Sequence, residues 1–366
     1  MYNSIPFVYP AIRKAAVVAM LSVSAALAQT GPSIFPLLPP TVSTVPSNGD
    51  VNPYGVAFVP KTAPTSGVLQ PGDILVSNFN SAQNLQGTGT TIVRVDKSGK
   101  VSTFFTSPAP AIGLTAALGM LSNGFVLVGN LPTADGTAAT AQPGRLAVLD
   151  NYGRFLGTFG TLSTVNGPWG MAVYDVGNGV TGTAKVFLSN VLSGEISRFD
   201  ISYNSQGLSA SVIVLATGFS HRPDPAALEL GPSGLAYDQI HDVLYVASSA
   251  DNAIYQVANA RAAQGTVSAT LLVQDLLHLH GPLDVAILPD GHILVADSDG
   301  SNADPNQPSE LVEFTAVGEF VGQMPVDPNN GGAFGLAVNN FGWGTFRLAA
   351  VDDNANTLSI WTAVIP

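Results

Sequence analysis

Short runs of apolar residues recur along the chain after residue 50, and each run is bounded by Gly, Asn, Asp or Pro. The runs are rich in β-branched and aromatic residues, which is typical of β-strands of roughly four to eight residues. The sequence lacks a sustained i, i+3, i+4 apolar stripe of helical length. The pattern therefore predicts an all-β protein.

The runs repeat as a unit. A first apolar run begins at six positions spaced 64, 51, 64, 50 and 51 residues apart, which are Gly55, Gly119, Gly170, Gly234, Asp284 and Gly335. A second run in each copy ends in a polar residue, a third run alternates, and a fourth follows in five copies. The first two runs are almost continuously apolar, as strands covered on both faces should be, whereas the later ones alternate as outer strands do.

Four short antiparallel strands in each of six repeats predict a six-bladed β-propeller. The last copy, residues 335–366, has room for three strands only. We expect Thr41–Val45 to pair with the third strand of that copy and close the ring; the alternative is a Pro-rich leader without fixed structure over residues 29–50. The expected organisation is a signal peptide (1–28), a leader with the ring-closing strand (29–50) and the propeller (51–366).

The N-terminal segment has the parts of a secretory signal peptide. Arg13 and Lys14 precede the apolar run Ala15–Ala28, which ends in Ala26-Leu27-Ala28. This run is shorter than the roughly 20 residues that a membrane-spanning helix needs. We expect cleavage and a secreted or periplasmic protein without membrane insertion; the alternative is a buried N-terminal helix.

Composition narrows the possible partners. Apolar residues make up 46% of the 366 residues and charged residues only 10%, which excludes a disordered chain. The net charge of −12 argues against nucleic acid as a partner. The absence of cysteine excludes disulfides and thiolate metal sites. We expect a monomer whose partner is a small molecule or a protein.

The repeats resemble those of a known family. The Gly-x-Ala-Val start of the first strand, the Val-x-Asp/Asn end of the second and the Asn-x-Ile third strand look like NHL repeats, most clearly in residues 234–257 and 281–314. The resemblance covers nearly all of residues 51–366 and extends to exported bacterial proteins of this type. Related propellers include ligand-binding scaffolds, gluconolactonase-type metal hydrolases, strictosidine-synthase-like enzymes and peptidyl-hydroxyglycine lyases. The resemblance therefore implies a fold and not a particular reaction.

Long loops gather on one predicted face of the propeller, where the second strand ends and the first begins. They follow the second strand in residues 79–89, 131–144 and 298–309, and precede the first strand of the fourth blade in residues 218–231. Loops of this kind are the usual place for binding groups. Surface loops also tolerate insertions at little cost, which is the alternative explanation.

Three histidines lie in loops that lead into the fourth and fifth blades. His278 and His280 form a His-x-His pair, and His221 precedes Arg222. Imidazole nitrogens from neighbouring blades are suitable ligands for Zn²⁺ or Cu²⁺, and a metal with an open position would activate water. Alternatively, one histidine caps its turn and His221 is exposed to solvent.

Polar residues end most of the second strands, namely Asn78, Asn130, Asn190, Asp297 and Asp352. Their oxygens are of the kind that Ca²⁺ prefers. The resemblance to gluconolactonase-type propellers implies an axial metal held by Glu, Asn and Asp; Asn190 and Asp297 match by position in the repeat, but the first Glu is Glu195, so the Glu has no counterpart. The alternative is that these side chains form Asx turns.

Two smaller groups complete the candidates. Residues 297–304 have the carboxylate density of a calcium loop without the EF-hand order of residues, so a solvated loop is the alternative. Trp169 and Phe334 precede repeated glycines and lie either at the axial mouth or in the core. With Arg222 they are candidates for a ligand-binding face.

Two functions follow from the sequence. The first is an exported propeller that binds a small molecule or protein on its axial face. The second is a metal-dependent hydrolase or lyase that uses His221, His278 and His280, or Asn190 and Asp297, with Ca²⁺, Zn²⁺ or Cu²⁺. A structural protein of the envelope has no positive sequence signal.

Overall fold

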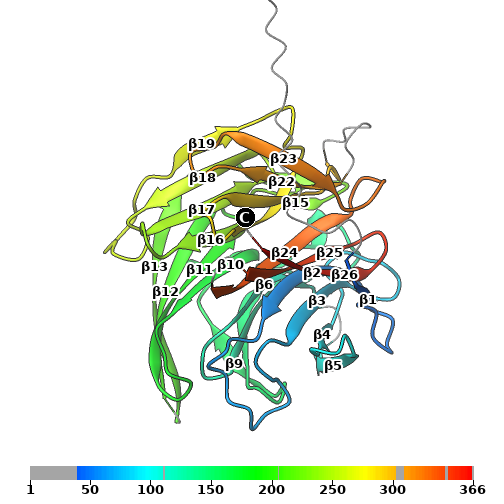
Figure 1. Ribbon diagram of the computed structural model, residues 1–366, viewed down its shortest axis with the longest axis vertical. Helices are drawn as coiled ribbons and strands as arrows, with labels where there is room; N and C mark the ends of the chain where they lie inside the picture. The colour runs from blue at the N-terminus through cyan, green and yellow to red at the C-terminus, as the bar shows by residue number, and fades with distance from the viewer. Residues whose placement is uncertain (1–38, 110–111, 205, 302–308, 343–344, 365–366) are drawn as a thin grey trace, which may run out of the picture.

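A computed structural model of the protein describes residues 39–109, 112–204, 206–301, 309–342 and 345–364. In these residues the secondary structure is almost entirely β, with one short 3-10 helix, η1 (Ala138–Thr140). The strands form six four-stranded antiparallel sheets. Figure 1 shows these sheets around a common centre, with the labels of first strands such as β2, β10, β16 and β24 nearest to it. The predicted six-bladed β-propeller is confirmed.

The strands of each blade run outward from the axis in chain order. Blade one contains β2 (Val51–Phe58), β3 (Ile74–Asn80), β4 (Thr91–Val95) and β5 (Val101–Thr106). Blade two contains β6 (Leu114–Met120), β7 (Val126–Asn130), β8 (Arg145–Leu149) and β9 (Phe155–Phe159). Blade three contains β10 (Pro168–Asp175), β11 (Gly182–Asn190), β12 (Glu195–Asn204) and β13 (Gly207–Thr217).

The second half of the ring follows the same plan. Blade four contains β16 (Pro232–Asp238), β17 (Val243–Ser248), β18 (Ala253–Ala258) and β19 (Thr270–Gln274). Blade five contains β20 (Pro282–Ile287), β21 (Ile293–Asp297), β22 (Glu310–Phe314) and β23 (Phe320–Pro325). Blade six contains β24 (Ala333–Gly342), β25 (Thr345–Asp352), β26 (Thr357–Val364) and β1 (Thr41–Ser43). A small hairpin, β14 (Arg222–Asp224) and β15 (Leu228–Leu230), precedes blade four.

The ring is closed by the N-terminal strand, as the sequence predicted. Strand β1 pairs antiparallel with β26, so that Val42 lies opposite Leu358. Next to this strand, the amide nitrogen of Asn78 donates to the carbonyl of Thr44 at 3.2 Å. The last blade therefore obtains its fourth strand from the other end of the described chain, and the edge of β26 is covered.

The first strands contact one another around the axis in a closed circle. Small residues permit this approach: a Cβ added to Gly170 would collide with the backbone of Ser233, and one added to Gly335 with that of Tyr54. Buried hydroxyl groups then bond each blade to the next, at distances of 2.6 to 2.8 Å from hydroxyl to carbonyl oxygen. The pairs are Ser77 to Thr115, Thr115 to Pro168, Ser189 to Ser233, and Ser233 to Pro282.

Asp284 takes the place of a hydroxyl between blades five and six. Its Oδ2 accepts the backbone N–H of Leu336 at 2.9 Å, and its Oδ1 accepts that of Val285. This role explains why the repeated glycine is replaced here. Burial raises the pKa of the Asp284 carboxyl to about 7, although both hydrogen bonds act to lower it.

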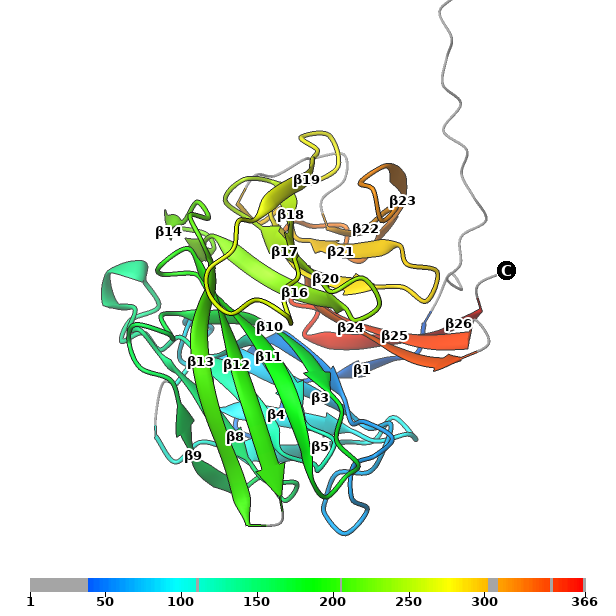
Figure 2. The same cartoon turned by 90° about the vertical axis from the view of Figure 1, so that its left-hand side faces the viewer.

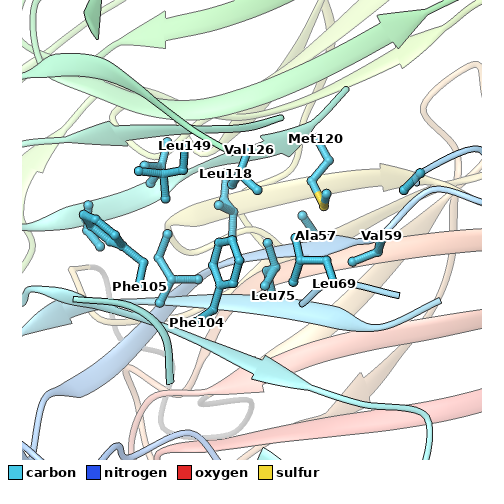
Figure 3. Packing of buried hydrophobic residues seen from close by; sticks show 14 residues of the cluster. Ala57, Val59, Leu69, Leu75, Phe104, Phe105, Leu118, Met120, Val126 and Leu149 are labelled. Atoms are coloured by element: carbon cyan, nitrogen blue, oxygen red, sulfur yellow. The ribbon is translucent and has the colours of Figure 1, made fainter. Parts of the chain in front are cut away.

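Apolar side chains fill the spaces between neighbouring blades. Figure 3 shows the layer between blades one and two, in which Leu75 and Phe104 pack against Leu118, Val126 and other apolar residues. Strand β3 is buried along its whole length, whereas the outer strand β5 is buried only in part. The predicted contrast between inner and outer strands is confirmed.

Blade three is longer than its neighbours. Figure 2 shows β12 and β13, which have 10 and 11 residues, as long green strands that run beyond the adjacent blades. The Tyr203 hydroxyl at the extended end donates to Asp175 and lies 2.5 Å from the Ser122 hydroxyl of blade two. The extension is therefore tied to blade two.

The expected signal peptide, residues 1–28, lies outside the described residues. Within the described ranges, no helix has both the length and the apolar character needed to cross a membrane.

Candidate functional site

Aromatic side chains close the axis of the propeller. Tyr54, Trp169 and Phe334 come from the first strands of blades one, three and six, and each directly precedes a repeated glycine. The Tyr54 ring centroid lies 5.5 Å from that of Trp169 and 4.6 Å from that of Phe334, and Phe79 stacks on Tyr54 at 4.7 Å. Tyr54 and Trp169 are buried. These rings form a solid floor in place of an open channel.

A cavity of about 300 Å³ lies above this floor, close to the lower end of the range for small-molecule sites. Loops from four parts of the ring enclose it. They contribute Asn80, Asn84 and Gln86 from blade one, Ala226 and Ala227 from the β14–β15 hairpin, Ser298, Gly300 and Ser301 from blade five, and Asp353 and Asn354 from blade six. Three of the long loops expected from the sequence thus meet here.

The cavity wall has unused capacity to accept hydrogen bonds. Asn52 Oδ1, Asn80 Oδ1 and Gln86 Oε1 are buried and have no hydrogen-bond partner among the described residues, and all three side chains line the cavity. The nitrogens of two of these amides are already used, because Asn80 Nδ2 donates to Asn84 Oδ1 at 2.7 Å and Gln86 Nε2 to the Ala226 carbonyl at 2.9 Å. Since the Ala226 carbonyl can only accept, the orientation of the Gln86 amide is fixed. Buried acceptors are normally paired with a protein group or with ordered water, so these oxygens need a donor that the described residues do not supply.

Asp353 supplies a carboxyl group to the same wall. Burial, with a contribution from the charge of Asp352, raises the pKa of Asp353 to about 8. Burial also raises the pKa of the Tyr54 phenol, and the nearby Asp353 adds to that shift. Near neutral pH, Asp353 can therefore exist protonated or ionised, as a general acid or base must.

Three carboxylates lie directly behind the cavity wall. Asp297, Asp299 and Glu310 are buried, and one ligand oxygen from each lies within 4.8 Å of the others. Ser298, which lies between the two aspartates, lines the cavity. Burial raises the pKa of Asp297 well above its usual value, and the neighbouring Asp299 and Glu310 contribute to the shift.

A second group, at the other end of β21, has a different character. His292 Nδ1 lies 2.6 Å from Glu313 Oε1 and 3.7 Å from Asp290 Oδ2. These side chains are partly or fully exposed, and the histidine already has a carboxylate partner. An ordinary surface ion pair explains this group.

The three histidines expected to share a metal do not come together. Within the part of the chain that the structure describes, no group of three potential ligands with atoms within 4.8 Å contains His221, His278 or His280. His278 bonds to Asp275 at 2.7 Å and stacks on Phe320, with ring centroids 3.7 Å apart. His221 Nδ1 lies 3.2 Å from the Phe219 carbonyl, and the backbone N–H of His280 donates to Asp297 at 2.7 Å.

The polar ends of the second strands mostly bond to nearby protein groups. Asn78 donates to Thr44 and Thr91, Asn130 bridges Ile112 and Arg145, and Asn190 bridges Asn166 and Ser197. These bonds join residues 7 to 34 positions apart, so they are not the Asx turns of the alternative, and these three side chains do not line the axial cavity. Asp297 belongs to the buried carboxylate group, and Asp352 is buried next to Asp353.

The remaining predicted site residues lie in different places. Trp169 and Phe334 line the cavity, and Trp169 is also part of the core, so both sequence alternatives hold for it. Arg222 is exposed on β14, where its Nη1 lies 3.4 Å from the Ala250 carbonyl. The predicted loop of residues 297–304 extends beyond residue 301 into positions outside the described residues.

The sequence analysis missed five cavity residues: Asn52, Asn80, Asn84, Gln86 and Asp353. Three of them belong to the long loop 79–89 or its border, so the loop length was a usable signal. Asn52 lies three residues before Gly55 and Asp353 directly follows Asp352, and only the geometry of the closed ring brings Asn52 and Asp353 to one cavity.

The protein is a six-bladed β-propeller with a polar axial cavity, and solved structures of other proteins share the propeller fold. A gluconolactonase from Xanthomonas campestris has 11% identity and a TM-score of 0.53, over 88% of this chain and 89% of that chain. A putative gluconolactonase has 14% identity and a TM-score of 0.53, over 90% and 94%. A streptogramin B lyase has 14% identity and a TM-score of 0.50, over 89% and 87%.

At these identities the likeness shows the fold alone. No protein-family model matches the sequence, and the search of curated proteins found no match. The resemblance to NHL repeats is therefore supported only as far as the propeller fold.

Proposed function

We propose that the protein binds a small, hydroxyl-rich molecule in its axial cavity. The observation that carries this proposal is the set of three unpaired amide oxygens, on Asn52, Asn80 and Gln86, around one cavity. Each unpaired buried acceptor costs about 1–3 kcal/mol of folding free energy. A ligand that donates hydrogen bonds would recover part of this cost, which makes the cavity selective for donors.

The chemistry of the walls narrows the ligand class. The acceptors favour hydroxyl or amino groups, and the aromatic floor of Tyr54, Trp169 and Phe334 favours a ligand with an apolar face. A compact polyol or monosaccharide combines both properties. The volume of about 300 Å³ limits the ligand to a small molecule.

An enzymatic role is the second candidate, and Asp353 is the observation that favours it. With a pKa of about 8, its carboxyl group is suited to proton transfer close to neutral pH. A hydrolase or lyase would use Asp353 as the acid or base beside the bound molecule. In that case Asp353→Asn would abolish turnover and leave ligand binding largely intact.

Export and family membership are also proposed. The segment Arg13–Ala28 supports secretion or a periplasmic location through a cleaved signal peptide. The repeated glycine-led strands support membership of the NHL-type propellers. N-terminal sequencing of the protein recovered from the periplasm and medium tests export, and we expect it to begin after Ala28.

Binding can be tested with three variants of the purified protein. Saturation-transfer NMR against a panel of monosaccharides and polyols should identify a ligand for the wild-type chain. We expect Asn80→Ala and Gln86→Ala to weaken its binding by about tenfold each, as the loss of one hydrogen bond would. The matched control is Asn204→Ala, an exposed asparagine at the far end of blade three, which should bind as the wild type does. Binding that is unchanged in both cavity variants, or no ligand in the panel, would contradict the proposal.

A further inference from the structure

The geometry points to a calcium site formed by Asp297, Asp299 and Glu310 behind the wall of the axial cavity. Asp297 ends β21 and Glu310 begins β22, and the two residues lie directly opposite each other in the paired strands. Asp299 follows two residues after Asp297 in a left-handed backbone conformation, with φ of 55°. Three carboxylates from one hairpin are thereby brought to the same point.

The dimensions of the group suit one ion. Ca²⁺ binds oxygen at about 2.3–2.6 Å, so two oxygens on a common ion lie at most about 5 Å apart. The ligand oxygens of the three residues lie within 4.8 Å of one another. All three ligands are carboxylates, which favours Ca²⁺ over Zn²⁺ or Cu²⁺.

Asp297 provides a second and separate indication. Its side chain is fully buried, and Oδ1 has no hydrogen-bond partner among the described residues, whereas Oδ2 accepts the backbone N–H of His280. A buried carboxylate oxygen without a partner is costly, and a bound cation is one of the two ways to remove that cost. The other way is protonation.

The sequence of blade five contains no lysine or arginine. There is no lysine or arginine between Arg261 and Arg347, a stretch that includes all of blade five. Buried acidic groups are ordinarily paired with a base or with a metal. A bound cation would balance the charge of these acids, which no lysine or arginine of this blade can do.

An ion at this point would also position the cavity wall. Ser298, Gly300 and Ser301 line the cavity, and the two aspartates flank Ser298. The Ser298 carbonyl accepts hydrogen bonds from the Gly331 backbone at 2.6 Å and from the Ser309 hydroxyl at 3.1 Å. Calcium would therefore hold one side of the cavity in place, and we expect it to tighten ligand binding. This last consequence rests on the proposed function, but the ion site itself does not.

Calcium titration of the full chain tests the site. After treatment with a chelator, calorimetry with CaCl₂ should show one ion bound per chain, and the ion should raise the melting temperature. We expect Asp297→Asn and Glu310→Gln each to lower the calcium affinity at least about tenfold. The matched control is Glu319→Gln, an exposed glutamate on the same blade, which should bind calcium as the wild type does.

Several outcomes would overturn the inference. No calcium binding by the wild-type chain would do so, as would equal affinity in Asp297→Asn and the control. Should Asp297→Asn fail to fold, Glu310→Gln and the wild-type stoichiometry decide the matter. The Asn80→Ala variant separates the two proposals. It should bind the cavity ligand more weakly and bind calcium as the wild type does, and it should bind calcium in the same way if the cavity has no ligand.

Discussion

Several aspartates in the first half of the ring have a lysine or arginine partner, whereas Asp284 and Asp353 in blades five and six have none in the part of the chain that the structure describes. In the first region, burial acts to raise the pKa of Asp200, but hydrogen bonds from Arg198 and Lys185 outweigh it and the pKa is lowered. In the second region, burial raises the pKa of Asp284 to about 7 and that of Asp353 to about 8, and neither side chain has a basic partner among the described residues. Basic partners offset the cost of burying the ionised carboxyl of Asp200, whereas no basic partner in the described ranges offsets that cost for Asp284 and Asp353.

The distribution of basic residues explains this difference. Blades one to three contain Arg94, Arg154, Lys185 and Arg198, each in an ion pair with an aspartate. The basic residue of blade six, Arg347, instead donates to the Gly72 carbonyl of blade one. The comparison teaches that acids without a basic partner serve two different places, Asp284 between blades five and six and Asp353 in the cavity wall.

Removing a basic partner in the first region should have the largest effect. Arg198 is buried, and it donates to Asp200 and to the carbonyls of Ala260, Arg261 and Ala263 at 2.8 to 3.0 Å. We expect Arg198→Ala to lower the free energy of unfolding by about 3–5 kcal/mol, because it removes a buried side chain and leaves three carbonyl groups without their donor, while Lys185 still pairs with Asp200. Urea denaturation measures the change. Arg222→Ala, at an exposed position, should change it by less than about 0.5 kcal/mol. Similar changes in the free energy of unfolding for both variants would contradict the structural role that we assign to Arg198.

Removing the Asp284 carboxyl should raise the free energy of unfolding at high pH, whereas removing Arg198 should lower it. A pKa raised from 3.8 to about 7 means that folded Asp284 holds its proton more tightly than the unfolded chain does. Its contribution to stability is therefore complete below about pH 4 and is lost as the pH rises to about 7.

We therefore expect Asp284→Asn to stabilise the protein at pH 8 relative to the wild type. The gain should be smaller than the roughly 4 kcal/mol that three pKa units represent, because the new amide nitrogen cannot accept the Val285 N–H. Urea denaturation at pH 5 and pH 8 measures it. A wild-type chain that loses no stability over this range relative to Asp284→Asn would contradict the prediction.

The smallest expected effect is a shift in the titration midpoint of Asp353 in the cavity. Its carboxyl ¹³C signal should titrate with a midpoint near pH 8, whereas that of the exposed Asp96 should titrate below 3.8, because hydrogen bonds from Ser98 and Lys100 lower the pKa of Asp96. A bound hydroxyl-rich ligand should shift the Asp353 midpoint and leave that of Asp96 unchanged. If Asp353 titrates near pH 4, the cavity wall is wetter than the structure implies.

The fold was predictable because its signals are local and repeated. The first strand of every blade except blade five contains the repeated glycine, and Gly170 is required by the close approach of the Ser233 backbone, so the period appears directly in the sequence. Ring closure was predictable by counting strands, since the last repeat contains only three. The pairing of β1 with β26 confirms that reasoning.

The site was less predictable because its residues are related by closure of the ring and not by the repeat. Gln86 and Ala226 are 140 positions apart and meet only across the top of the cavity. Most asparagines at the strand ends, such as Asn190, bond to the local backbone, and the sequence does not distinguish them from Asn80. Glu310 could have been found, because it is the first residue of the strand that pairs with β21 and must lie opposite Asp297.

The most direct test of the account is a crystal structure of the protein purified without chelator, with the axial cavity as the region of interest. We predict density for a small molecule or for ordered water within hydrogen-bond distance of the amide oxygens of Asn52, Asn80 and Gln86. The contrary result would be a cavity filled by the protein's own side chains, with each of those three oxygens bonded to a protein donor.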